Sequence, residues 1–316
     1  MKTLHSALVL LTGLGAAFGA WAAQPLLSPP ELDALRANPV VRIIDVRDSK
    51  SYAANHIPGA VSAPYGTWRG PASNPGELPD LAKLTALVQK LGLSPATHAV
   101  VVSSGADQSD FGSSARIYWT LKVLGLQELS ILNGGVKAWD QAKLPQESAP
   151  ATVAASDYKP TLNQRLITTR DEVQKAVESG SAQLVDARPE AFFNGETRHQ
   201  AAKYPGTLKG AVNLEHSLWF EPGTSKMVIG DPAQALAANL PANSKNKTVS
   251  FCNTGHWAAT NWFALSEVAG LDNVSLYPGS MVDFTQNGNG DLVGNVPGRA
   301  KQLLIDAKLW VERTFN

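Results

Sequence analysis

The only cysteine of the 316-residue chain lies in the stretch Val249-Ser250-Phe251-Cys252-Asn253-Thr254-Gly255-His256-Trp257-Ala258-Ala259-Thr260. Residues 249–251 have the composition of a strand, and apolar residues recur at helical spacing from Ala258 to Leu265. Cys252 therefore opens a loop between a strand and a helix, which is where ligands bind in an open α/β sheet. Unbonded N–H groups at the start of the helix would favour the thiolate, the nucleophilic form of the side chain.

We expect Cys252 to be a reactive thiol, although a free cysteine is also often a small buried apolar residue. Gly255 indicates a tight loop, and its position excludes the Cys-x-x-Cys motif of thiol–disulfide oxidoreductases. A cysteine phosphatase needs arginine six residues after its nucleophile, and Ala258 stands there. One cysteine among scattered histidines has no metal-ligand spacing, so we expect neither a metal nor another cofactor.

The first 22 residues have the features of a secretory signal peptide. Lys2 supplies a positive charge, residues 4–18 are mostly apolar, and Ala20-Trp21-Ala22 fits the small-x-small cleavage rule. We therefore expect residues 1–22 to be removed and the mature protein to be periplasmic or secreted. One cysteine cannot form an internal disulfide, so the thiol of an exported chain is left for chemistry or for intermolecular pairing.

Basic and acidic residues balance at 27 each. A neutral chain provides no argument for nucleic acid or for a charged membrane surface as a partner. No stretch after residue 22 approaches the roughly 18 apolar residues of a membrane helix. We therefore expect no nucleic-acid partner and, after signal cleavage, no membrane partner. We also expect a monomer.

Five segments of the first half of the chain match segments of the second half, at offsets of 141 to 151 residues. Similar but unequal offsets are typical of duplicated domains with loop insertions. The matched segments are 41–47 with 183–188, 56–61 with 207–212, 99–103 with 248–252, 124–126 with 269–271, and 133–135 with 278–280.

Strands alternate with helices in each half, which predicts an α/β fold: two tandem domains, each a mostly parallel sheet with helices on both faces. In the first half we expect helices at 29–37, with Ser28 as cap, and 113–124, and strands at 40–46, 99–103 and 129–132. A linker rich in proline, alanine and serine spans residues 144–160. The predicted domains are residues 25–148 and 160–316.

The pattern Cys-x-x-Gly-x-x-Ala after a strand resembles the active-site loop of the tandem rhodanese sulfurtransferases, a family that uses thiosulfate or mercaptopyruvate. The turn His56-Ile57-Pro58-Gly59-Ala60 and the repeated Asp-x-Arg at 45–47 and 186–188 are also similar to that family. From the residues alone, an Asp-x-Arg pair after a strand most often stabilises a turn by local hydrogen bonds, and the resemblance implies the same structural role.

The resemblance implies that Cys252 takes a sulfane sulfur from a small anionic donor and carries it as a persulfide. A thiophilic acceptor such as cyanide or a thiol would then receive the sulfur. Thiosulfate, mercaptopyruvate and a protein persulfide all remain open as donors. The alternative function is a periplasmic persulfide carrier or redox-sensing module that uses Cys252 without rapid turnover.

Where the second copy has Cys252, the first copy has Ser103. A serine hydroxyl is a poor nucleophile without a base and cannot carry a persulfide. We therefore expect the first domain to be catalytically silent. The resemblance implies that it packs against the second domain and walls the active-site cleft.

The loop residues Asn253, Thr254, Gly255, His256 and Trp257 are the expected substrate-binding group. They match neither the cationic loop typical of thiosulfate sulfurtransferases nor the small neutral loop typical of mercaptopyruvate sulfurtransferases. His256 either contributes a partial positive charge or faces solvent, because an ordinary histidine pKa leaves its charge undecided. Trp257 is expected to line the cleft.

The family's tandem members place a donor-binding arginine shortly after the second Asp-x-Arg, and Phe192 stands there instead. Arg198 is the candidate that remains for holding a sulfonate or carboxylate, since a guanidinium fork suits such oxyanions. A solvated loop charge is the alternative for Arg198. Lys203 and Lys209 are weaker candidates for the same role.

Overall fold

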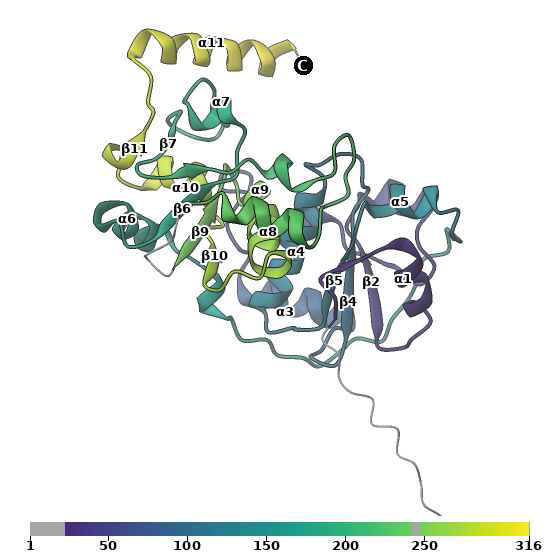
Figure 1. Cartoon of the computed structure of the whole chain (residues 1–316). Coiled ribbons are helices and arrows are strands. Elements are labelled where there is room, and N and C mark those ends of the chain that lie inside the picture. Colours follow the sequence, from purple (N-terminus) through teal and green to yellow (C-terminus); the bar gives the residue numbers. More distant parts are fainter. Residues whose placement is uncertain (1–22, 242–246, 316) are drawn as a thin grey trace, which may run out of the picture.

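The computed structural model describes residues 23–241 and 247–315, so the predicted signal peptide at 1–22 lies outside the described residues. Two parallel sheets with flanking helices confirm the predicted α/β fold (Figure 1). The first sheet has the order β1 (Leu26–Leu27), β5 (Leu129–Leu132), β4 (His98–Val102), β2 (Val41–Asp45) and β3 (Val61–Ser62). The second has the order β10 (Val274–Leu276), β9 (Thr248–Phe251), β6 (Gln183–Asp186) and β8 (Val212–Asn213), while β11 (Val293–Gly294) pairs antiparallel with β7 (Thr207–Leu208).

The helices follow the same alternation in both halves. The first half contains α1 (Pro29–Leu35), α2 (Ser49–Ala54), η1 (Tyr65–Trp68), α3 (Leu81–Lys90), α4 (Phe111–Val123) and α5 (Gly135–Gln141). The second contains η2 (Gln164–Leu166), α6 (Arg170–Ser179), α7 (Glu190–Phe193), η3 (His216–Trp219), α8 (Asp231–Ala238), α9 (Trp257–Phe263), the π-helical η4 (Ala264–Val268), α10 (Ser280–Asn287), η5 (Gly290–Leu292) and α11 (Arg299–Phe315). No helix in the described part of the chain is long and apolar enough to cross a membrane.

Local signals in the sequence account for several element boundaries. Ser28 caps α1 through a capping box with Glu31, as its type and spacing predict. The strand predicted at 129–132 is observed with the same bounds, and the helix predicted at 113–124 begins two residues earlier, at Phe111. The two-residue strand β1 was not expected, because its pairing with β5 is a tertiary contact.

The two cysteine-loop positions have the same backbone frame, which confirms the internal repeat in three dimensions. The carbonyl of Cys252 accepts from the N–H of Met281, and that of Asn253 accepts from Val282. In the first half, the carbonyls of Ser103 and Ser104 accept from residues 136 and 137 in the same way. The duplication therefore keeps the loop geometry and changes the chemical group at its start.

The helices that follow the two loops, α4 and α9, pack against each other between the sheets (Figure 1). The ring of Phe263 on α9 makes edge contacts with the rings of Phe111 and Tyr118 on α4, at centroid distances of 5.7 and 4.9 Å. One apolar core includes buried residues of both halves. Because this core is shared, the end of the first sheet lies against the cysteine loop of the second.

The segment from residue 144 to residue 163 runs along the first half of the molecule. The N–H of Ser156 donates to the carbonyl of Gln89, and the Tyr158 hydroxyl donates to the carbonyl of Leu124. These contacts fix the connection between the two halves, because they tie this segment to α3 and to the end of α4.

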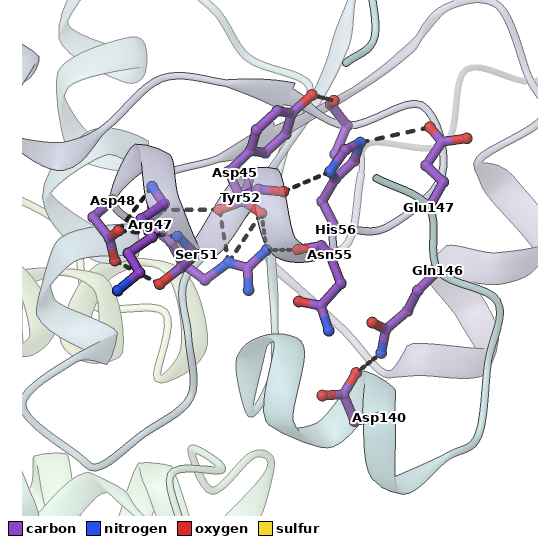
Figure 2. A network of polar contacts seen from close by, with 12 residues as sticks. Asp45, Arg47, Asp48, Ser51, Tyr52, Asn55, His56, Asp140, Gln146 and Glu147 are labelled. Atoms are coloured by element: carbon purple, nitrogen blue, oxygen red, sulfur yellow. Dashed lines mark hydrogen bonds and ion pairs between the residues drawn. The ribbon is translucent and has the colours of Figure 1, made fainter. Parts of the chain in front are cut away.

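The Asp-x-Arg motifs have the structural role that the residues predict. The guanidinium of Arg47 donates to both carboxylate oxygens of Asp45 and to the carbonyl of Asn55 (Figure 2). His56 stacks on the ring of Tyr52 and its Nδ1 bonds the Tyr52 carbonyl. In the first half, these contacts brace the turn that follows β2.

Candidate active site

Cys252 lies directly after β9 and its side chain is almost completely buried, at 1% exposure. Its N–H donates to the hydroxyl of Ser280 over 3.0 Å, and the N–H of Gly255 donates to the same oxygen over 3.2 Å. The Ser280 hydroxyl in turn donates to the carbonyl of Tyr277. Two of the loop donors expected around the sulfur are thus bound by Ser280, which sequence reasoning did not select.

Ser280 has a φ of 54° and is fully buried. A residue other than glycine in this region is uncommon, and such backbone strain is concentrated at functional sites. Its hydroxyl keeps the cysteine loop closed. In the described residues, the N–H groups of Asn253, Thr254 and His256 have no protein acceptor, and these groups remain available to an anion or a thiolate.

A cavity of about 210 Å³ adjoins Cys252 and lies between the two halves of the molecule. Most of the predicted loop residues line it, together with residues that the sequence did not indicate. The lining residues are Tyr65, Arg69, His199, Cys252, Asn253, Thr254, His256 and Trp257. Tyr65 and Arg69 come from η1 and the residue after it, so the first domain walls the cleft as expected.

Gly255 supports the loop without lining the cavity. Its φ is +67°, and a Cβ at this position would lie 2.4 Å from Nη1 of Arg116 and 2.5 Å from the carbonyl oxygen of Pro278. Only glycine fits, because both the backbone conformation and the space exclude a side chain. The absence of a side chain lets the buried guanidinium of Arg116 donate to the Gly255 carbonyl over 3.2 Å.

Arg69 provides the positive charge among the residues that line the cavity. Its Nη2 donates to the carbonyl of Thr254 over 2.7 Å, and its guanidinium lies 5.1 Å from the ring centre of Tyr65. Its Nη1 is buried and has no hydrogen-bond partner in the described residues. A buried, unsatisfied guanidinium nitrogen beside a small cavity is the group that an oxyanion would bind.

The ring nitrogens of His256 form hydrogen bonds with residues of the first domain. Its Nε2–H donates to the carbonyl of Ser109 over 2.8 Å, which leaves Nδ1 to accept from the Tyr65 hydroxyl, also over 2.8 Å. Burial, followed by the charge of Arg69, lowers the pKa of His256 to about 3. Both sequence-level alternatives are therefore wrong: the ring is neutral at physiological pH, and it is bonded on both sides within the protein.

The tight fit of His256 depends on a small residue in α4. A Cβ on Gly112 would lie 2.8 Å from Nε2 of His256. The ring can therefore approach α4 only because this position has no side chain. His199, the other histidine of the cavity, has a pKa lowered by burial and by the charge of Arg198, so it is also neutral near pH 7.

We predict that His256 makes the protein sensitive to mild acid. A histidine with a pKa of about 3 when folded and 6.5 when unfolded contributes its full stability above pH 6.5 and loses it as the pH falls toward 3. Urea unfolding midpoints between pH 5 and 7 should fall with decreasing pH in the wild type and fall less steeply in His256→Gln. Parallel curves for the two proteins would contradict the prediction.

Trp257 forms one wall of the cavity, as expected, and its ring is fixed from three sides. Its Nε1–H donates to the hydroxyl of Ser109 over 2.7 Å. Its ring stacks on that of His216 at 4.8 Å and meets the edge of Phe192 at 6.0 Å. Phe192, which replaces the arginine typical of the family, thus packs on the cavity wall and adds no charge.

Asn253 connects the cysteine loop to the second Asp-x-Arg motif. The buried Arg188 bonds both carboxylate oxygens of Asp186, and its Nη1 donates to Oδ1 of Asn253 over 3.3 Å. Its guanidinium also lies over the ring of Phe192. The motif therefore stabilises the turn, as predicted, and in the second domain it also positions the loop.

Arg198 lies outside the group of residues that line the cavity. Its Nη2 donates to Asp306 on α11 over 2.8 Å, and its Nη1 donates to the carbonyl of Ala202 over 2.6 Å. The structure therefore gives this guanidinium other partners, and its neighbour His199 faces the cavity instead. Neither Lys203 nor Lys209 lines the cavity, and the ammonium of Lys203 lies over the ring of Tyr204.

The family model of the rhodanese-like domain matches this chain twice, at residues 28–142 and at residues 169–287. The chain belongs to the rhodanese family. A thiosulfate sulfurtransferase of Pseudomonas aeruginosa is 30% identical over 263 residues, covering 82% of this chain and 93% of the relative. The 3-mercaptopyruvate sulfurtransferase of Escherichia coli is 26% identical, covering 78% of this chain and 90% of that protein.

Solved structures have the same fold over most of the chain. The crystal structure of SseA from Escherichia coli, described as a 3-mercaptopyruvate sulfotransferase, matches with a TM-score of 0.71 at 24% identity and covers 82% of this chain and 99% of that one. Tum1 of Saccharomyces cerevisiae matches with a TM-score of 0.73 at 21% identity. The chain is a tandem rhodanese-like sulfurtransferase of the thiosulfate and 3-mercaptopyruvate sulfurtransferase family.

In the first rhodanese-like domain, the loop that corresponds to the cysteine loop of the second domain is covered. Ser103 is 4% exposed, and the hydroxyl of Ser225 from the second domain donates to the carbonyl of Gly105 in the same loop. Asn133 exchanges two hydrogen bonds with the backbone of Met227 beside it. The second domain therefore covers this loop by direct contact.

We predict that Ser103→Ala leaves sulfur-transfer turnover within about twofold of the wild type. The reason is that the serine hydroxyl cannot carry sulfur and its loop is covered by the second domain. Steady-state rates with a saturating donor test this. A hundredfold loss would show that the first domain takes part in the chemistry.

Proposed function

We propose that this protein transfers a sulfane sulfur from a small anionic donor such as thiosulfate to a thiophilic acceptor, through a persulfide on Cys252. One observation carries the proposal: Cys252 lines the same small cavity as Arg69, a residue whose buried Nη1 has no hydrogen-bond partner among the described residues. Its volume of about 210 Å³ lies below the range of about 300–1,000 Å³ that is common for drug-sized ligands. It suits an anion of a few atoms.

In the first step, the Cys252 thiolate attacks the outer sulfur of thiosulfate. The sulfur–sulfur bond of the donor breaks, sulfite leaves with the electron pair, and Cys252 becomes a persulfide. Arg69 would hold the sulfonate oxygens, and the loop N–H groups of Asn253, Thr254 and His256 would stabilise negative charge close to the sulfur.

In the second step, an acceptor such as cyanide attacks the terminal sulfur of the persulfide. The bond between the two sulfurs breaks, thiocyanate leaves, and the Cys252 thiolate is restored. Arg116 would assist both steps indirectly, because its guanidinium donates to the Gly255 carbonyl and so positions the cysteine loop. Burial, followed by the charge of Arg69, lowers its pKa to about 9, so it stays charged at neutral pH close to the cysteine loop.

The choice between thiosulfate and mercaptopyruvate depends on the charge of the cavity. Arg69 is its one arginine or lysine among the described residues, and both lining histidines are neutral. One cation favours binding of an anion but does not require the double charge of thiosulfate. Mercaptopyruvate, which carries a single carboxylate, therefore stays a candidate donor within the same proposal.

Steady-state rates with thiosulfate and with mercaptopyruvate, measured side by side with cyanide as acceptor, test the proposed function. Catalytic turnover with either donor supports a sulfurtransferase. Loading of Cys252 without turnover would favour the persulfide carrier instead, and the absence of loading would refute both.

If residues 1–22 direct export, as we propose, the mature protein will appear in the periplasm or medium and begin near Ala23.

A further inference from the structure

The last helix, α11, lies outside both sheets and follows an extended segment after β11 (Figure 1). Two residues on its inner side show how the helix is held. Ile305 is buried, at 7% exposure, and Asp306 forms the ion pair with Arg198 in the loop after α7. These contacts fix which side of the helix faces outward.

The outer side of α11 carries an apolar stripe of residues spaced three and four apart. The spacing is that of one face of an amphipathic helix. The stripe consists of Ala300, Leu303, Leu304, Ala307, Trp310 and Val311. All six are exposed, and the larger ones strongly so: Leu303 at 65%, Leu304 at 71%, Trp310 at 58% and Val311 at 48%. Monomeric proteins rarely expose apolar side chains together in this way.

Basic residues border the stripe on both sides. At about 100° per residue, Arg299 falls on one border, and Lys301 and Lys308 fall on the other. All three are exposed. By the same rotation Asp306 lies beside Arg299 and Glu312 lies beside Lys301, but Asp306 is already paired with Arg198, so each border keeps a net positive charge.

This charge pattern argues against a second copy of the same helix as the occupant of the stripe. In an antiparallel pair, each border would face the same border of its partner, so the net positive border of Lys301, Lys308 and Glu312 would face its own copy. In a parallel pair, the lysine border would meet the border with Arg299. Borders of net positive charge would face each other in both arrangements, which is unfavourable along a helix interface.

An anionic bilayer surface fits both features of α11. An apolar stripe with tryptophan, bordered by lysine and arginine on a helix of about 25 Å, is the pattern of helices that lie in the plane of a membrane interface. The apolar side chains would enter the region between headgroups and acyl chains, and the basic borders would meet lipid phosphates.

We propose that α11 binds this protein to the surface of anionic phospholipid membranes. The net charge of zero, from which we expected no membrane partner, does not describe the local charge of this helix. In this proposal, the ion pair between Arg198 and Asp306 positions α11 so that the apolar stripe faces away from the rest of the protein.

The test is sedimentation of the mature chain, from residue 23 to the C-terminus, with vesicles. We expect binding to vesicles of phosphatidylglycerol and phosphatidylcholine at least tenfold stronger than to phosphatidylcholine alone. Replacing Lys301 and Lys308 by glutamine should weaken binding by about fivefold for each lysine. Leu303→Asp should abolish binding, whereas Ile229→Asp, a matched change at an exposed apolar residue of 62% exposure, should not.

Sulfur loading of Cys252 should be unchanged in Leu303→Asp, which separates this result from the fate of the proposed function. Equal sedimentation of Leu303→Asp and wild type, or no binding to anionic vesicles, would overturn the proposal. A dimer in analytical ultracentrifugation that Leu303→Asp dissociates would also overturn it, because the stripe would then be an interface between two copies.

Discussion

Cys252→Ser should abolish the acquisition of transferable sulfur. The wild-type protein, incubated with donor and freed of excess, should gain one sulfur atom, about 32 Da, because the thiolate is the nucleophile that forms the persulfide. The serine variant should gain none, and its turnover should fall to background. Intact-mass spectrometry measures the first effect and thiocyanate formation the second.

The fold provides a matched control for this experiment. Ser103→Cys, introduced together with Cys252→Ser, places a thiol in the equivalent loop of the first domain. That loop has the same backbone frame but is covered by Ser225 and does not border the cavity with Arg69. We expect no sulfur on the new cysteine. Sulfur at that position would contradict this expectation, because it would show that the loop backbone is sufficient for sulfur loading without the cavity. Sulfur on the single Cys252→Ser variant would refute the assignment of Cys252 as the nucleophile.

Arg69→Ala should raise the Michaelis constant for the donor by roughly ten- to a hundredfold. A charge-assisted hydrogen bond contributes about 1.5–3 kcal/mol, and Arg69 is the arginine that borders the cavity. Transfer of sulfur from preloaded protein to a neutral thiol should change less than twofold. Loading and unloading are therefore measured separately by rapid mixing.

Arg198→Ala is the matched control, since it removes the same group from the same molecule at a position outside the cavity. We expect its donor constant to stay within twofold of the wild type. Arg69→Lys should recover part of the loss, because it keeps the charge without the fork. Normal loading in Arg69→Ala, or a large defect in Arg198→Ala, would contradict this prediction. A large defect in Arg198→Ala would instead support Arg198 as the donor-binding residue. Thermal unfolding of each variant excludes global destabilisation.

Local patterns in the sequence were sufficient for the architecture and for the position of the nucleophile. The repeat, the short apolar strands and the capped helices depend on neighbours within a few residues, and these predicted two parallel sheets. The single cysteine after a strand could be placed at a sheet edge for the same reason. The exchange of cysteine for serine between the copies needed only an alignment of the chain with itself.

The charge and the walls of the cavity were decided by tertiary structure. Arg69 reaches Thr254 because α4 and α9 pack together, and no local pattern around Arg69 predicts that contact. His256 loses its charge because Ser109 and Tyr65 enclose it, although its sequence neighbours suggest an ordinary histidine. Arg198 was a reasonable candidate by spacing, but Asp306 on the last helix binds it. The physical reason is common to all three: desolvation and ion pairing depend on which groups the fold brings together, and those groups are distant in sequence.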